Sequence, residues 1–107
     1  MINSNRKGKV GERELAAFLR TFGLEARRGQ QYEGGNDSPD VVSSLVDVHL
    51  ECKRCERGNL YDWLQQAQED APSTATPVVA HRRSRSGWVA ILSLTDLINL
   101  LKQAGRA

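Results

Sequence analysis

The sequence predicts an α/β fold, because segments with helical periodicity alternate with short segments that have the pattern of β-strands. Apolar residues recur at steps of three and four in the helical segments, whereas apolar and polar residues alternate singly in the strands. Charged residues make up 26% and hydrophobic residues 39% of the chain, the balance of a folded protein. At 107 residues the chain is long enough for one core only, so we expect a single domain over residues 1–107.

The N-terminal part of the chain predicts a helix over residues 4–22 and then a strand over residues 24–30. The apolar stripe of this helix consists of Leu15, Phe18, Leu19 and Phe22. Gly23 is placed to end the helix. A polar, glycine-rich loop is expected over residues 31–38.

The central part predicts two strands, over residues 40–45 and 46–54, joined by a turn near residues 43–45. This hairpin returns Asp40 to the neighbourhood of Glu51. On the later strand, one face carries Val46, Val48, Leu50 and Cys52. The other face carries Asp47, His49, Glu51 and Lys53. We expect the first face to join the core and the second to carry the chemistry.

The C-terminal part predicts a helix over residues 59–71, strands over residues 78–83 and 88–94, and a last helix through about residue 103. The buried stripe of the first of these helices consists of Leu60, Trp63, Leu64, Ala67 and Ala71. Residues 93–96 resemble a capping box at the start of the last helix.

Asp40, Glu51, Cys52 and Lys53 form the arrangement P-D-(x10)-E-C-K, which places two carboxylates and a lysine a short hairpin apart. Mg²⁺ prefers a few carboxylate oxygens and keeps several of its waters, so two acids and a backbone carbonyl suffice to hold it on a phosphate. The spacing therefore predicts metal-dependent phosphodiester hydrolysis.

The distribution of charge is more informative than the net charge of +2. Basic residues form clusters around an acidic centre, which consists of Glu33, Asp37, Asp40, Asp47 and Glu51 in the middle of the chain. The clusters are Arg6-Lys7-Lys9, Arg27-Arg28, Lys53-Arg54-Arg57 and Arg82-Arg83-Arg85. This pattern suits a polyanion held over a metal site, and solvated surface is the equal alternative for any one cluster.

Cys52 and Cys55 form a C-x-x-C motif, with His49 three residues upstream and His81 further along the chain, so a zinc or redox site has to be weighed. A strand through this segment points positions 52 and 55 to opposite faces, which disfavours shared ligation. Reduced thiols are therefore the expected state.

The order helix, three strands, helix, strand, with P-D and E-x-K on the second and third strands, resembles the PD-(D/E)XK nuclease superfamily. Within it, the chain looks most like the archaeal-type Holliday junction resolvases and their phage relatives. This second resemblance is carried by the segment K-G-x-x-G-E-R-E-L over residues 7–15, Ser38-Pro39-Asp40, Glu51-Cys52-Lys53 and Gln66. It implies a restriction-endonuclease-like domain: an αβββαβ core with a mixed central sheet flanked by helices, here with an extra C-terminal helix.

The resemblance also implies a role for each site residue. Asp40, Glu51 and the carbonyl of Cys52 would bind one or two Mg²⁺ ions, with Mn²⁺ as a possible substitute. Lys53 would position or deprotonate the attacking water, or stabilise the pentacovalent phosphate. Glu12 matches a family acid that contacts a metal directly or through water, although a hydrogen bond within the structure is the alternative. Gln66 matches a supporting glutamine, with a surface amide as the equal alternative.

The implied activity is that of a Mg²⁺-dependent endodeoxyribonuclease acting on branched DNA as a homodimer. A nuclease that nicks or trims duplex or flap DNA, and a non-catalytic DNA-binding module, are the alternatives. Candidate phosphate contacts are Arg6, Lys7, Lys9, Arg54 and Arg57. A candidate dimer surface on the last helix consists of Leu97, Ile98, Leu100 and Leu101. Without a membrane-length apolar run or a secretory signal, we expect a cytoplasmic location in a bacterial or phage-infected host cell.

Overall fold

The computed structural model describes residues 4–29 and 39–107, with side chains described from Gly8 onward in the first range. The elements follow in the order α1 (Ser4–Arg20), β1 (Ala26–Arg28), β2 (Val41–Ser43), β3 (Val48–Arg54), α2 (Leu60–Asp70), β4 (Thr76–Arg82), β5 (Val89–Ile91) and α3 (Leu94–Gln103). The predicted αβββαβ order is confirmed, with β5 and α3 added at its C-terminal end. The glycine-rich loop expected over residues 31–38 lies outside the described residues.

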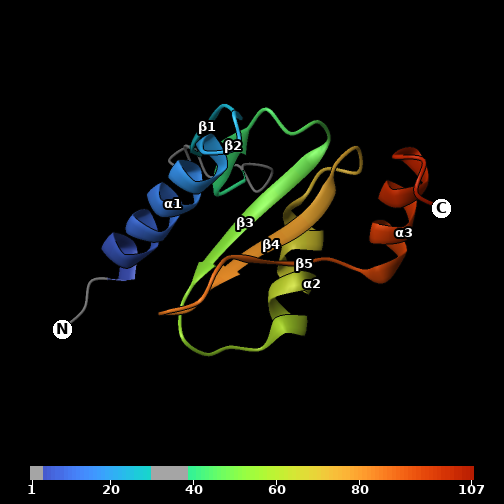
Figure 1. Ribbon diagram of the computed structural model, residues 1–107. Coiled ribbons are helices and arrows are strands. Elements are labelled where there is room, and N and C mark those ends of the chain that lie inside the picture. Colours follow the sequence, from blue (N-terminus) through green and yellow to red (C-terminus); the bar gives the residue numbers. More distant parts are fainter. Residues whose placement is uncertain (1–3, 30–38) are drawn as a thin grey trace.

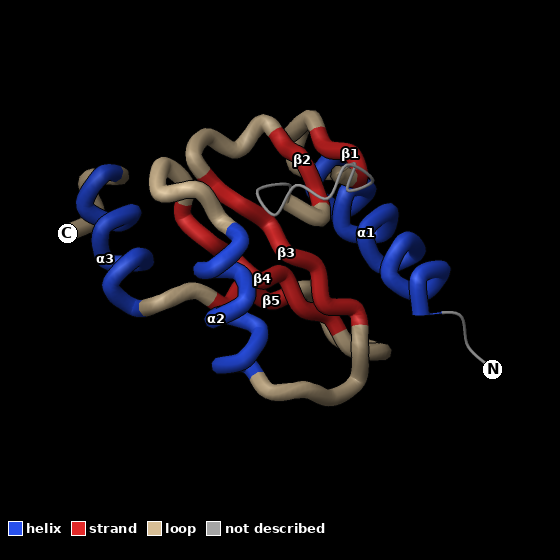
Figure 2. The backbone as a smooth tube through the Cα atoms, turned by 180° about the vertical axis from the view of Figure 1, so that it is seen from behind, coloured by secondary structure: helices blue, strands red, loops and turns tan. Residues whose placement is uncertain are grey.

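One mixed sheet forms the centre of the molecule, with strand order β1-β2-β3-β4-β5. β3 and β4 are parallel, and every other neighbouring pair is antiparallel. Parallel neighbours need a crossover connection, and α2 supplies it. The two views of the chain show α1 against one face of the sheet and α2 against the other (Figure 1, Figure 2).

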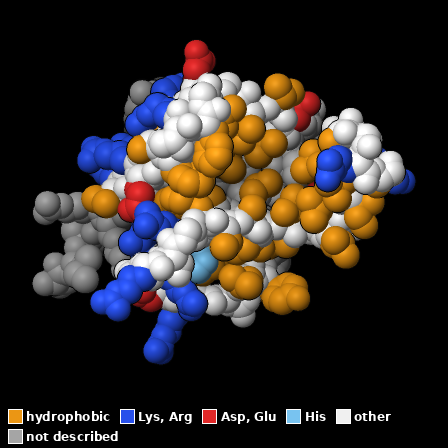
Figure 3. All heavy atoms as spheres, in the orientation of Figure 1, with side chains coloured by type: hydrophobic (Ala, Val, Ile, Leu, Met, Phe, Trp, Pro, Cys, Tyr) orange, Lys and Arg blue, Asp and Glu red, His pale blue; other side chains and the backbone are white. Residues whose placement is uncertain are grey.

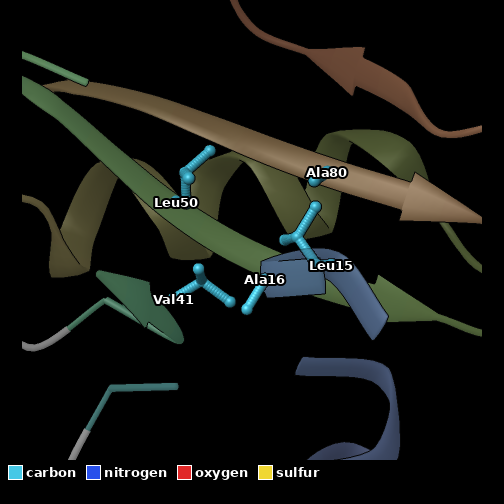
Figure 4. Close-up of a cluster of buried hydrophobic side chains, with 5 residues drawn as sticks. All are labelled: Leu15, Ala16, Val41, Leu50 and Ala80. Atoms are coloured by element: carbon cyan, nitrogen blue, oxygen red, sulfur yellow. The ribbon is translucent and has the colours of Figure 1, made fainter. Parts of the chain in front are cut away.

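The face of the sheet under α1 holds the main hydrophobic cluster (Figure 4). This cluster consists of Leu15, Ala16, Val41, Leu50 and Ala80. Gly11 lets α1 approach β3 closely, because a Cβ at this position would lie 2.6 Å from the Cβ of Arg54. The helix that carries Glu12 is therefore seated directly over the strand that carries Glu51.

The face of the sheet under α2 is also buried. Val79 on β4 and Ala67 on α2 are fully buried. His49 and Glu51, on the face of β3 that we expected to carry the chemistry, are only 3% and 8% exposed. The predicted alternation along β3 is confirmed, but its polar face lies beneath a helix because the crossover between parallel strands has to pass there.

The start of β3 differs from the prediction. Val46 was expected to face the core, but it is 82% exposed and precedes the strand, which begins at Val48. The turn between β2 and β3 contains more residues than the sequence suggested. Within this turn, Asp47 adopts a positive φ of 57°, and its carbonyl accepts a hydrogen bond from the Thr76 amide at 2.7 Å. The expected placement of Val46 on the core face is therefore wrong.

α3 lies at the end of the molecule opposite α1 (Figure 1). Its predicted N-terminal cap is present, because the Ser93 hydroxyl accepts a hydrogen bond from the Asp96 amide at 3.1 Å. None of its residues is buried, and its most exposed large apolar side chains are Leu94, Leu97, Ile98 and Leu101. Within the described ranges, no helix has the length and apolar character needed to cross a membrane.

Candidate active site

Asp40 lies where the chain enters β2, and three hydrogen bonds to backbone groups fix its position. Its amide donates to the carbonyl of Leu50 at 2.9 Å, and its carbonyl accepts from the amide of Gly29 at 2.8 Å. Its side-chain Oδ2 accepts from the amide of Cys52 at 2.8 Å. The carboxylate is therefore held against β3 by the backbone of β3 itself.

Glu51 lies beside Asp40, and its pKa is raised to about 9. Burial is the largest cause, followed by the negative charge of Asp40 and a side-chain hydrogen bond with it. Asp70, near the end of α2, raises the pKa further, whereas Lys53 lowers it. The structure thus brings Asp40, Glu51 and Lys53 together, and near neutral pH the carboxyl pair retains a proton.

His49 is a partner of Glu51 that the sequence analysis did not assign. Its Nε2 lies 2.9 Å from Oε1 of Glu51, and both side chains are buried. The two residues are neighbours on one face of β3. The alternation along this strand could therefore have predicted their contact. Sequence analysis weighed His49 only as a zinc ligand. Asp70 was missed altogether, because its proximity depends on how α2 packs.

Glu12 lies close enough to Asp40 for the two charges to interact, but it has a different hydrogen-bond partner. Its Oε1 accepts a hydrogen bond from Nε of Arg28 at 3.0 Å. Burial raises the pKa of Glu12, Arg28 lowers it, and the charge of Asp40 raises it. Among the described residues, no group of three or more His, Cys, Asp or Glu side chains is arranged to hold a metal ion. The two carboxyl groups that the structure brings into contact are those of Asp40 and Glu51.

This pair fits a hard divalent cation. Mg²⁺ is usually bound through one or two carboxylates while it keeps several waters. Two adjacent carboxyl groups, one of them protonated chiefly because it is buried and further because of the charge of the other, are the arrangement that a cation would stabilise in its ionised form. The chemistry of the donor set thus supports a metal site here.

Cys52 and Cys55 are both free thiols. The Sγ of Cys52 lies near Gly11 of α1, on the face of β3 opposite Glu51. Burial, with smaller contributions from Asp40 and Glu12, raises the pKa of the Cys52 thiol to about 12. A thiol with so high a pKa remains protonated near neutral pH, so it is not an activated nucleophile.

The remaining candidate residues are spread over the surface. Gln66 is exposed on α2 and has no side-chain hydrogen bond to another described residue. Lys9 and Arg57 are exposed, whereas Nε of Arg54 lies 3.2 Å from Oε1 of Glu14. Arg54 also lies 3.5 Å from Glu56, so part of its charge is balanced within the protein. Arg6 and Lys7 belong to α1, but their side chains lie outside the described part.

The fold and the carboxylate pair beside a lysine define a nuclease of the PD-(D/E)XK class. Residues 3–107 match the model of a protein family described as "Phage putative PDDEXK endonuclease". This match spans nearly the whole chain, so the chain belongs to that family of endonucleases. No curated protein matches the chain, and neither does any solved structure. The superfamily prediction is confirmed, and the narrower resemblance to archaeal-type Holliday junction resolvases stays a prediction.

The raised pKa of Glu51 predicts how the stability of the metal-free protein depends on pH. The folded state binds a proton up to about pH 9, whereas an unfolded glutamate releases it near its ordinary pKa of 4.5. Between these values the folded state holds more protons, so the free energy of unfolding falls as pH rises. Urea unfolding in EDTA at pH 5.5, 7 and 8.5 should show this decline.

Glu51→Gln should flatten the decline, because glutamine does not titrate. The matched control is Glu69→Gln, at an exposed position of α2, which should leave the decline unchanged. The same slope in Glu51→Gln and in the parent protein would show that Glu51 is not the group responsible.

Proposed function

We propose that the chain is a divalent-metal-dependent endodeoxyribonuclease that hydrolyses phosphodiester bonds in branched DNA, with Mg²⁺ as its cofactor and Mn²⁺ as a substitute. The proposal rests chiefly on the contact of Asp40 with the buried Glu51, and on Lys53, which shares a face of β3 with Glu51. Membership in an endonuclease family supports the reaction class. The preference for branched DNA is supported only by the resemblance of the sequence motifs to junction resolvases.

Asp40 and Glu51 would hold the metal ion, with the Cys52 carbonyl as a further ligand and Glu12 acting directly or through a water. When bound, the ion supplies a Lewis acid for the phosphate and lowers the pKa of a water. Asp40 contributes a carboxylate fixed by the Cys52 amide, so little reorganisation is needed on binding. Glu51 has to lose its proton to serve as a ligand, and His49 lies in contact with it at 2.9 Å.

Lys53 supplies the remaining chemistry. It is half-buried on β3, close enough to Glu51 to lower the pKa of that carboxyl. A compact ammonium group in this place orients the attacking water, assists its deprotonation or stabilises the negative charge that develops on the phosphate. Gln66 is the supporting amide in this proposal.

DNA would be held by phosphate contacts from basic side chains around the site. Lys9 and Arg57 are exposed and available for such contacts. Arg6, Lys7 and Arg54 complete the proposed set, with Arg54 shared between DNA and its acidic neighbours. Such contacts position a polyanion without reading its sequence.

A cleavage assay tests the function. Purified protein with Mg²⁺ should cut a labelled four-way junction faster than a duplex, a flap or a single strand. Glu51→Gln, Asp40→Asn and Lys53→Met should each lower the rate by about 100-fold or more, the usual cost of removing a group that stabilises the transition state. EDTA should abolish cleavage, and Mn²⁺ should restore it.

Glu69→Gln is the matched control and should cut at the rate of the parent protein. Wild-type rates for Glu51→Gln would refute the site. Equal rates on duplex and junction would favour the duplex nuclease, and DNA binding without metal-dependent cleavage would favour the non-catalytic module.

The proposed enzyme acts as a homodimer, because symmetric cutting of two strands needs two sites. Support comes from α3, whose exposed Leu94, Leu97, Ile98 and Leu101 recur at steps of three and four and so form one apolar stripe. A ten-residue helix is marginally stable in water alone, so a partner surface would stabilise it.

Light scattering should give twice the mass of one chain. Leu97→Glu combined with Ile98→Glu should give the monomer mass, because charge in the stripe opposes its burial. Tyr61→Glu, at an 84% exposed position of α2, should remain dimeric. A monomeric parent protein would contradict the homodimer.

A further inference from the structure

A pocket of about 380 Å³ opens beside the candidate active site, between the start of α2 and the strands β4 and β5. Its apolar wall is formed by Leu60 and Trp63 of α2 and by Val89 and Ile91 of β5, with His81 of β4 between them. The volume falls in the range of pockets that bind small molecules, about 300–1,000 Å³. Its size and lining suit a flat ring system.

The aromatic wall of this pocket is rigid. The rings of Trp63 and His81 lie 4.8 Å apart at 47°. His81 is itself anchored, because its Nε2 lies 2.9 Å from the carbonyl oxygen of Cys55. Gly58 packs against the indole so closely that a Cβ there would lie 1.9 Å from Cζ2 of Trp63. An immobilised aromatic side chain loses little entropy when a ligand ring packs against it.

The rim of the pocket is basic. Arg57 and Arg83 line it, and both side chains are exposed. Glu56 also lines it, but its carboxylate is occupied by the Ser84 amide at 2.9 Å and by Arg54 at 3.5 Å. Figure 3 shows a histidine at the surface where Lys and Arg side chains on one side meet hydrophobic side chains on the other. An apolar pocket with guanidinium groups at its edge is complementary to a ring that carries a phosphate.

The strand register places this pocket next to the reacting centre. Lys53 of β3 is paired with His81 of β4, and Glu51 is paired with Val79. Paired residues on parallel strands point to the same face of the sheet, and neighbouring strands lie about 4.8 Å apart. The pocket is thus about one strand spacing from Lys53, on the face that carries Glu51.

We propose that this pocket binds an unpaired nucleobase of the DNA strand, close to the scissile phosphate. Bases within a duplex are stacked and paired, so they cannot enter, whereas bases at branch points, flaps and single-stranded ends can. The base packs against Trp63 and the apolar wall while Arg57 and Arg83 contact its phosphates. This inference rests on the proposed function, because it takes the bound strand to be the substrate. It makes unpaired nucleotides a determinant of where the enzyme cuts.

Binding can be measured without cleavage, in EDTA, through the fluorescence of Trp63. The chain has two tryptophans. Trp88 lies on the other side of the sheet, where the centroid of its ring is 6.4 Å from that of Phe18. The substitution Trp88→Phe therefore isolates the signal of Trp63. Titration with a short oligo(dT) strand should change the emission saturably. A hairpin duplex of equal length should bind at least about tenfold more weakly through this signal.

Leu60→Glu is the test variant. Leu60 is the first residue of α2 and 48% exposed, so glutamate is tolerated there while its charge opposes a phosphate-bearing ring. It should weaken oligo(dT) binding by about tenfold or more. Val46→Glu, with the same charge at an 82% exposed position before β3, should not do so.

Two results would overturn the proposal that this pocket binds a base. One is no change in Trp63 emission on addition of oligo(dT). The other is equal weakening of oligo(dT) binding by Leu60→Glu and Val46→Glu. The two proposals fail separately. Protein that binds oligo(dT) in this way but cleaves no DNA refutes the proposed function alone. Protein that cleaves DNA with no Trp63 response refutes the pocket alone.

Discussion

The contact between two acidic side chains, Asp40 and Glu51, constrains this structure more than any other. The pairing of β2 with β3 brings the carboxyl groups together, and a hydrogen bond from the Cys52 amide keeps Asp40 in place. α2 then buries Glu51. Burial of Glu51 and the negative charge of Asp40 both favour a proton on the pair. A cation bound there would replace that proton and stabilise the native state.

Around the acidic pair, basic side chains divide into two groups. Arg28, Arg54 and Arg82 form ion pairs with acids of α1, Arg28 with Glu12 and the other two with Glu14. These contacts join α1 to the sheet. Lys53 and the arginines at the pocket rim form no ion pair with a described residue, so they are available to a negatively charged ligand. A basic cluster in the sequence can therefore contain both residues that form ion pairs within the protein and residues that are available to a ligand.

The order of elements and the mixed sheet could be predicted, because the helical and strand periods are set by each element's own burial pattern. The approach of Asp40 to Glu51 could be predicted as well, since a hairpin brings its own ends together. Three features could not. The exposure of Val46 depends on the length of a turn, and the proximity of Asp70 and the burial of His49 depend on how α2 crosses the sheet. These are long-range packing effects that local patterns do not encode.

The central claim is that Asp40 and Glu51 together hold a divalent cation, and calorimetric titration with Mg²⁺ tests it most directly. Ligands have to be deprotonated, so binding near pH 7 should release about one proton, seen as heats that differ between buffers of unlike ionisation enthalpy. Glu51→Gln and Asp40→Asn should each lose this binding. Unchanged binding in both variants, or binding that releases no proton, would contradict the claim.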